Sequence, residues 1–125
     1  MKISAGGLLF VALTIIFTVV GQLLVKRGTQ VAGVAPTQAS QLPRYAVHVM
    51  TNPLVVLGLL AAVVAAVAWT IAVSKTALSV AYPFMALAIV LVLTLSNVSL
   101  GERLSVQAWV GVGFVCLGLV ITSRG

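Results

Sequence analysis

Residues 3–27 read ISAGGLLFVALTIIFTVVGQLLVKR, an apolar run that ends in two adjacent cations. About 20 apolar residues are enough for an α-helix to cross the hydrocarbon core of a bilayer. The run is longer than the roughly 7–15 apolar residues of a secretory signal peptide. Lys26 and Arg27 also separate it from the small residues at 32–35 that could resemble a cleavage site. The stretch therefore predicts an uncleaved membrane helix.

The rest of the chain has the same apolar character. Of its 125 residues, 62% are hydrophobic and 6% are charged, whereas soluble domains carry about 25% charged residues. A chain of this length cannot hide so much apolar surface in one core, so lipid must cover it. The formal net charge is +6, with Glu102 as the single acid. Because the cations are scattered among apolar runs, they indicate helix-end anchors or contacts to anionic lipid headgroups, and no nucleic-acid partner.

This pattern predicts an all-α integral membrane protein, a single domain with four transmembrane helices. The helices are expected at about residues 3–26, 53–74, 81–100 and 105–122. Asn52 and Pro53 are typical of a helix start, with a capping side chain and a proline in the first turn. Ser105 is a candidate N-cap for the last helix. Four spans place both termini on the same side of the membrane.

The first connection, residues 27–52, is long for a link between helices. Its middle is small and polar, and residues 42–50 then place apolar side chains at helical spacing, with Arg44 and His48 on another face. This segment predicts a short amphipathic helix lying in the membrane interface.

The cations do not set the orientation of the chain in the membrane. Cations concentrate in cytoplasmic loops, whereas acids contribute little to orientation. The side with the termini carries three cations and the other side four, namely Lys2, Lys75 and Arg124 against Lys26, Arg27, Arg44 and Arg103. The near tie is compatible with insertion in both directions or with orientation by a partner.

The chain has too few acidic, histidine and cysteine residues to form the sets that most catalytic chemistry needs. The chain has one Glu, one His, one Cys and no Asp, and none is visibly paired, so acid–base or nucleophilic catalysis and clustered metal ligands are not supported. We expect no enzyme activity, no metal and no cofactor. Proton-coupled transport normally places an ionisable group within the membrane, but Glu102 falls in the four-residue link 101–104. A carboxylate-driven proton antiporter is therefore strongly disfavoured.

A polar stripe follows the first helix, where Thr14, Thr18, Gln22 and Lys26 recur every four residues. Each step advances about 40° around a helix, so the four side chains form one slowly drifting line. An amide facing lipid would leave its donors and acceptor unpaired, so the stripe should face the bundle interior or a wet groove. Two interpretations remain open. In the first, the threonine hydroxyls bond to their own helix, Gln22 bonds to a neighbouring helix and Lys26 is a charge anchor. In the second, Gln22 and Lys26 form the mouth of a polar groove that receives an anionic headgroup.

Three further polar side chains lie near the expected span ends. Tyr82 could line the same path or act as an interfacial aromatic. Lys75 is equally explained as a charge anchor, and Arg103 could simply pair with the neighbouring Glu102.

Gly111 and Gly118 lie seven residues apart in the last helix and so share a face. Small residues let membrane helices approach closely. Since four short helices make a thin bundle, this face is a candidate contact with a second copy.

Five segments together resemble a known superfamily. They are GQLLVK at 21–26, NPLVVLGLL at 52–60, ALSVAYPFMAL at 77–87, LGERLS at 100–105 and WVGVGFVCLGLVI at 109–121. In this order they resemble the drug/metabolite transporter superfamily in its four-helix, small-multidrug-resistance-like (EamA-like) form. The resemblance covers nearly the whole chain except about residues 28–50.

Two branches of that superfamily are relevant. Small multidrug resistance exporters are antiparallel dimers that use a glutamate in their first helix, and the resemblance puts Thr18 at that position. Their aromatic drug platform falls on Met85, although Tyr82 is kept. These departures argue against drug/proton exchange.

The closer resemblance is to the aminoarabinose-phosphoundecaprenol flippase subunits, which share the end of the first helix and the AYP turn. That branch implies movement of a polyprenyl-phosphate-linked sugar across the bacterial inner membrane. The resemblance carries its glutamine and lysine over to Gln22 and Lys26.

The leading hypothesis is therefore a flippase, or a flippase subunit, for a lipid-linked sugar, working as a homodimer or as a heterodimer with a similar subunit. The expected substrate-binding residues are Gln22, Lys26, Tyr82 and Thr18, with Arg27, Lys75 and Arg103 as weaker phosphate contacts. Two alternatives are an exporter of small metabolites or cations from the same superfamily, and a non-transporting subunit that supports a glycosyltransferase.

Overall fold

The computed structural model describes residues 4–125, and every regular element in this part of the chain is helical. The expected start of the first helix at residue 3 and Lys2 lie outside the described residues. The elements are α1 (Ala5–Ala32), a short 3₁₀ turn η1 (Ala39–Gln41), α2 (Leu42–Met50), α3 (Pro53–Lys75), α4 (Leu78–Ser99) and α5 (Val106–Arg124). Helices α1, α3, α4 and α5 are long and apolar enough to cross a membrane. The predicted fold class is confirmed, including the short helix in the first connection.

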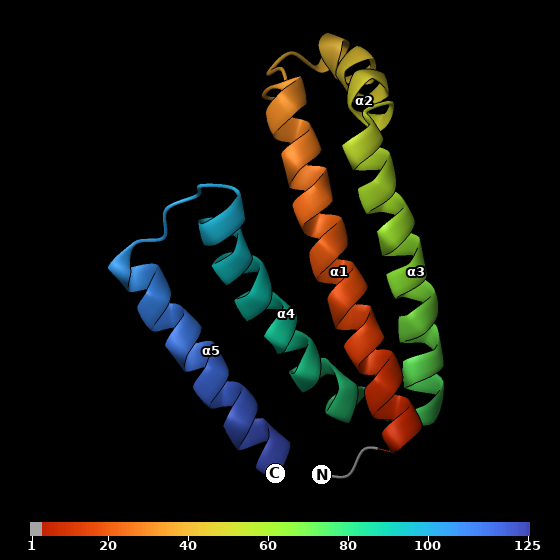
Figure 1. Ribbon diagram of the computed structural model, residues 1–125, viewed down its shortest axis with the longest axis vertical. Coiled ribbons are helices and arrows are strands. Elements are labelled where there is room, and N and C mark those ends of the chain that lie inside the picture. The colour runs from red at the N-terminus through yellow and green to blue at the C-terminus, as the bar shows by residue number, and fades with distance from the viewer. Residues whose placement is uncertain (1–3) are drawn as a thin grey trace.

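Figure 1 shows two helix pairs side by side. Helices α1 and α3 run antiparallel along one side, α4 and α5 form the other side, and α2 caps the end where α1 passes to α3. The beginning of α1 and the end of α5 lie at the opposite end of the molecule. This arrangement agrees with an even number of spans.

Side chains that satisfy free backbone N–H groups begin three of the long helices. The Ser4 hydroxyl accepts from the N–H of Gly7 at 3.0 Å, the Asn52 side-chain oxygen accepts from Leu54 at 2.9 Å, and the Ser105 hydroxyl accepts from Ala108 at 3.1 Å. Such caps stabilise a helix start because the first-turn N–H groups lack partners within the helix. The expected caps at Asn52 and Ser105 are confirmed.

Helix α1 is six residues longer at its C-terminal end than expected. It continues through residues 27–32 and ends at Gly33, whose φ of 93° suits a glycine. Gly28 lies so close to α3 that a Cβ there would come within 2.5 Å of a methyl group of Val55. This close packing favours continued helix where the polar residues suggested a loop, and it places Lys26 inside the helix.

Helix α4 begins at Leu78, three residues before the expected start at 81. The N–H groups of Val80 and Ala81 both donate to the carbonyl of Ala77, at 3.0 Å each. Pro83 therefore lies in the second turn rather than at the helix start. A proline there removes one backbone donor, but the helix continues.

Helices α1 and α3 approach through glycines. A Cβ on Gly21 would lie 2.8 Å from the carbonyl oxygen of Gly58, and a Cβ on Gly58 would lie 2.7 Å from that of Gly21. Only residues without a side chain permit this contact. The pair continues through buried alanines on α3, namely Ala61, Ala65, Ala68 and Ala72. Helix α1 is thereby fixed in rotation relative to α3.

Candidate substrate groove

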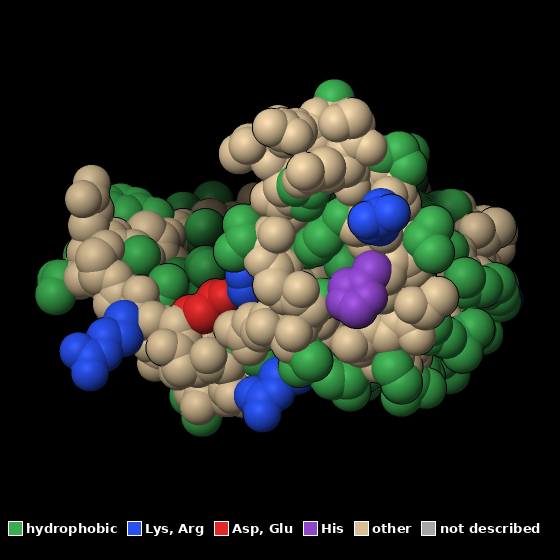
Figure 2. Space-filling view, turned by 90° about the horizontal axis from the view of Figure 1, so that it is seen from above, with side chains coloured by type: hydrophobic (Ala, Val, Ile, Leu, Met, Phe, Trp, Pro, Cys, Tyr) green, Lys and Arg blue, Asp and Glu red, His purple; other side chains and the backbone are tan. Residues whose placement is uncertain are grey.

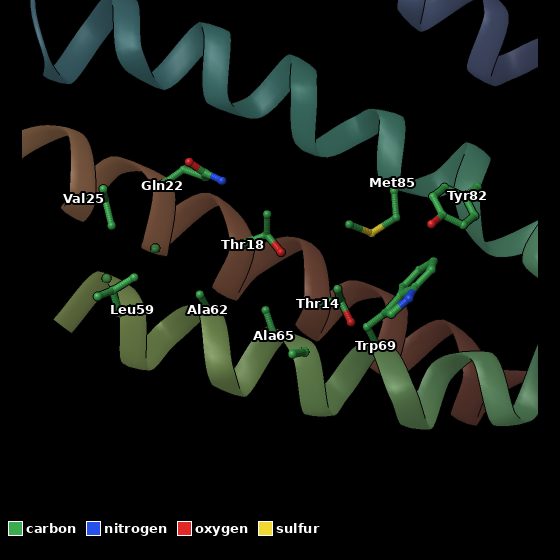
Figure 3. Close-up of a pocket in the computed structure, with 13 residues that line it drawn as sticks. Thr14, Thr18, Gln22, Val25, Leu59, Ala62, Ala65, Trp69, Tyr82 and Met85 are labelled. Atoms are coloured by element: carbon green, nitrogen blue, oxygen red, sulfur yellow. The ribbon is translucent and has the colours of Figure 1, made fainter. Parts of the chain in front are cut away.

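A groove of about 500 Å³ lies between α1, α3 and α4. It is lined by Thr14, Thr18, Gly21, Gln22 and Val25 from α1, by Gly58, Leu59, Ala62, Ala65, Ala66 and Trp69 from α3, and by Tyr82 and Met85 from α4. Figure 3 shows the labelled polar side chains of α1 directed into the space between the three helices. The close packing at Gly21 and Gly58 forms its floor. The groove thus brings Tyr82 of α4 together with Thr18 and Gln22 of the α1 stripe.

The polar residues of the α1 stripe differ in whether their side chains have a hydrogen-bond partner within the protein. Thr14 is buried, and its hydroxyl donates to the carbonyl of Phe10 at 2.7 Å, which is the bond within its own helix that one interpretation predicted. Within residues 4–125, the side-chain amide of Gln22 has no hydrogen-bond partner, and Gln22 is exposed. An unpaired amide on an apolar wall can donate to and accept from a ligand. Gln22 is therefore the stripe's strongest candidate for a ligand contact inside the groove.

Two aromatic rings meet at the other end of the groove from Gln22 (Figure 3). The ring centroids of Trp69 and Tyr82 are 5.1 Å apart with an interplanar angle of 77°, an edge-to-face pair. Met85 lies beside them. Trp69 was not among the predicted site residues. The sequence feature that could have indicated it is a tryptophan inside an alanine- and valine-rich span. It lies six residues, or about 9 Å, before the end of α3, which is deep for an interfacial aromatic.

Lys26 lies beyond Gln22 on the same stripe and is paired with the chain's single acid. Its Nζ is 3.5 Å from Oε1 of Glu102, and their side chains are 53% and 42% exposed. Of the two interpretations given for Arg103, pairing with Glu102 is not observed, because Glu102 pairs with Lys26 of α1 instead. Figure 2, which looks onto this end of the molecule, shows the acid in contact with a cation.

Gln22 and Lys26 connect the groove to two smaller hollows. One, of about 250 Å³, is lined by Gln22, Leu23, Lys26, Val92, Ser96, Leu100 and Glu102. The other, of about 460 Å³, is lined by Lys26, Thr29, Gln30, Gly33, Val34, Ala35 and Tyr45. Neighbouring hollows share a stripe residue, Gln22 or Lys26, so the three hollows follow one another along α1.

The remaining predicted cations do not line the groove. Arg27 and Arg103 are exposed near its Lys26 end. Lys75 lies at the opposite end, where a Cβ on Gly6 would be 3.6 Å from its Cδ. Gly6 and Lys26 are 20 residues apart on one helix, or about 30 Å, so Lys75 and Lys26 mark opposite ends of the groove's helices.

The two glycines predicted for a dimer contact have free space beside them within the protein. A Cβ on Gly111 or on Gly118 would meet nothing within 4 Å. Among the described elements α5 contacts α4 alone. The contact with a second copy stays a prediction.

Nearly the whole chain matches the model of one protein family. The model of the EamA-like transporter family matches residues 2–124. The chain belongs to this family. This EamA-like protein is therefore a multi-pass membrane protein of the drug/metabolite transporter superfamily, whose members are transporters. No curated protein and no solved structure gives a significant match to it.

Proposed function

We propose that this EamA-like protein is a flippase that moves a polyprenyl-phosphate-linked sugar across the bacterial inner membrane. The observation that carries the proposal is the placement of Thr18, Gln22 and Tyr82 on one groove, with Lys26 in the next hollow along the same helix. The sequence resemblance to the aminoarabinose-phosphoundecaprenol flippase subunits supports the same substrate class.

The groove suits a lipid with a polar head and a long apolar tail. Its walls are mostly apolar side chains and glycines, and Thr14, Thr18 and Gln22 lie along a single line on α1. A headgroup can exchange hydrogen bonds along that line while the tail stays in the bilayer, so the protein does not have to enclose the whole molecule. The cation at Lys26 complements the phosphate that joins sugar and tail.

The proposed movement needs no proton coupling. The chain's only carboxylate is in the α4–α5 link, and the stripe carries Thr18 where related drug exporters hold their glutamate. Synthesis of the glycolipid on one face and its consumption on the other maintain a gradient that drives net transfer. The dimer proposed from Gly111 and Gly118 would cover α5 with a second copy or with a similar subunit.

The aromatic end of the groove favours a second candidate, export of a small organic cation. Trp69 and Tyr82 both line the groove, and the faces of such rings attract cations. No anion stands beside them in residues 4–125, because the single acid lies at the Lys26 end. A cation would therefore bind there through the rings alone.

The test is transport by the purified protein in vesicles. A fluorescent polyprenyl-phosphate sugar in the inner leaflet should reach the outer leaflet faster than in protein-free vesicles, and unlabelled polyprenyl phosphate should compete. Uptake of a quaternary ammonium dye that polyprenyl phosphate does not inhibit would favour the cation exporter instead. If neither molecule moves, the chain alone is not a transporter, and support of a glycosyltransferase becomes the better hypothesis.

A further inference from the structure

The ion pair between Lys26 and Glu102 joins the two halves of the molecule. Lys26 belongs to α1, which packs on α3, whereas Glu102 belongs to the link between α4 and α5. It is the only ion pair within residues 4–125. The chain thus places its single negative side chain against the one cation that continues the polar stripe.

The backbone of the link holds Glu102 in that position. Gly101 adopts a φ of 70°, which turns the chain sharply after α4. The side-chain amide of Asn97 donates to the carbonyl oxygen of Glu102 at 2.9 Å, and the N–H of Glu102 donates to the carbonyl of Ser96 at 3.3 Å. The carboxylate therefore sits on a fixed turn rather than on a free loop.

The hollow beside this pair is lined by residues of the types that can bind phosphate. Its polar lining residues are Lys26, Gln22, Ser96 and Glu102. Ammonium and amide groups donate hydrogen bonds to phosphate oxygens, and a hydroxyl can do the same. A carboxylate cannot donate when ionised, and it repels an anion. Among these four residues, Glu102 is thus the one whose charge disfavours phosphate binding.

The geometry of the pair allows exchange. The separation of 3.5 Å is longer than the roughly 2.7–2.9 Å of a strong charge-assisted hydrogen bond. Both side chains are about half exposed, and ion pairs with such exposure contribute little stability. A phosphate that also bonds to Gln22 would make more contacts with this hollow than the carboxylate makes.

We propose that Lys26, Gln22 and Ser96 form a phosphate site and that Glu102 is its resident counter-ion, which the phosphate of a ligand displaces. The inference rests on the proposed function for its choice of a lipid phosphate as ligand. It adds that the chain's only acid competes with the ligand and keeps Lys26 paired when the site is empty. The same chemistry would accept free phosphate.

The experiment measures binding, not transport. Purified wild type and Glu102→Gln are titrated calorimetrically in detergent with farnesyl phosphate and, separately, with inorganic phosphate. Loss of the competing carboxylate should tighten binding of at least one probe about fivefold, which equals about 1 kcal/mol at 1.4 kcal/mol per tenfold. A gain for farnesyl phosphate alone identifies a lipid phosphate, and a gain for both identifies a general phosphate site.

Two further variants make the result specific. Gln107→Lys adds the same unit of charge at an exposed position in the first turn of α5, and it should leave the affinity unchanged. Lys26→Gln combined with Glu102→Gln should abolish the gain. Equal affinity of wild type and Glu102→Gln, a gain that survives loss of Lys26, or no binding of either probe by any variant would overturn the inference. Failure of the wild type to move glycolipid in vesicles would refute the proposed function but not this site.

Discussion

The α1–α3 half and the α4–α5 half of this EamA-like protein are built differently. Helices α1 and α3 meet through reciprocal backbone contacts at Gly21 and Gly58 and through a row of buried alanines. Helix α5 has one buried residue, Val112, and contacts α4 alone among the described elements. The α1–α3 pair is closely packed, whereas the α4–α5 pair is looser: α4 adds Ala81 and Ala88 to the core shared with α1, and α5 is held by α4 alone.

The two halves contribute differently to the groove. The packed pair fixes the rotation of α1, so the polar stripe keeps its direction into the groove. The loose pair supplies the opposite wall through Tyr82 and Met85, and a small shift of α4 would change the width of the groove. Small helix shifts at interfaces are a recurring element of switching transitions. Substitutions placed in each half test this difference in packing.

The largest effect is expected from Gly21→Leu in the packed half. Its Cβ would lie 2.8 Å from the carbonyl oxygen of Gly58, and backbone cannot yield as a flexible side chain can. Overpacking of this kind costs about 1–3 kcal/mol, so thermal unfolding in detergent should occur at a clearly lower temperature. Gly113→Leu in α5, where a Cβ meets nothing within 4 Å, is the matched control. Equal losses in both variants would show that the halves do not differ in packing.

The second effect concerns the two lysines at opposite ends of the groove's helices. Lys26→Ala should slow glycolipid movement about tenfold or more, because a hydrogen bond to a charged group contributes about 1.5–3 kcal/mol. Lys75→Ala, about 30 Å away along α1 by helix geometry, should leave the rate within about twofold. The measurement is the vesicle assay, with membrane insertion checked by protease protection. Unchanged movement in Lys26→Ala would remove Lys26 from the path.

A third, smaller effect separates two members of the stripe. Gln22→Leu should slow transport about fivefold, since the amide has no partner in residues 4–125 and is available to the headgroup. Thr14→Val should have little effect, because the Thr14 hydroxyl already donates to Phe10. Initial rates in the same vesicles compare the two variants. A larger loss for Thr14→Val would show that the stripe acts at its aromatic end instead.

Much of the fold could be predicted because its signals are local. Runs of about 20 apolar residues, a capping Asn52 and Ser105, and the four-residue spacing of the stripe depend only on neighbouring residues. The helix ends were less predictable. Residues 27–32 are polar enough for a loop, and they stay helical because Gly28 packs on Val55 of another helix, a contact that no local pattern contains.

The candidate site was predictable on one helix and less so across helices. The stripe on α1 follows from periodicity, and Tyr82 was found through a motif. Trp69 and the pairing of Lys26 with Glu102 depend on how α3 and the α4–α5 link approach α1. Lys26 and Glu102 are 76 positions apart in the sequence, and the acid's nearest cation in sequence, Arg103, suggested the wrong partner.

The smallest effect is expected at the open face of the loose half. Gly111→Leu should weaken self-association in lipid about threefold, because a bulky side chain on this face keeps a second α5 at a distance while the rest of the exposed surface still offers contacts. Gly113 lies about 200° around the helix from Gly111, so Gly113→Leu adds the same bulk on another face and should not change association. Energy transfer between labelled copies, measured against dilution in lipid, gives the dissociation constants. Since a Cβ at either position meets nothing within 4 Å, the two variants should be equally tolerated within one copy, and a difference between them points to the contact between copies. Identical constants would mean that the Gly111 face does not form the contact, and that the apolar surface of α5 faces lipid.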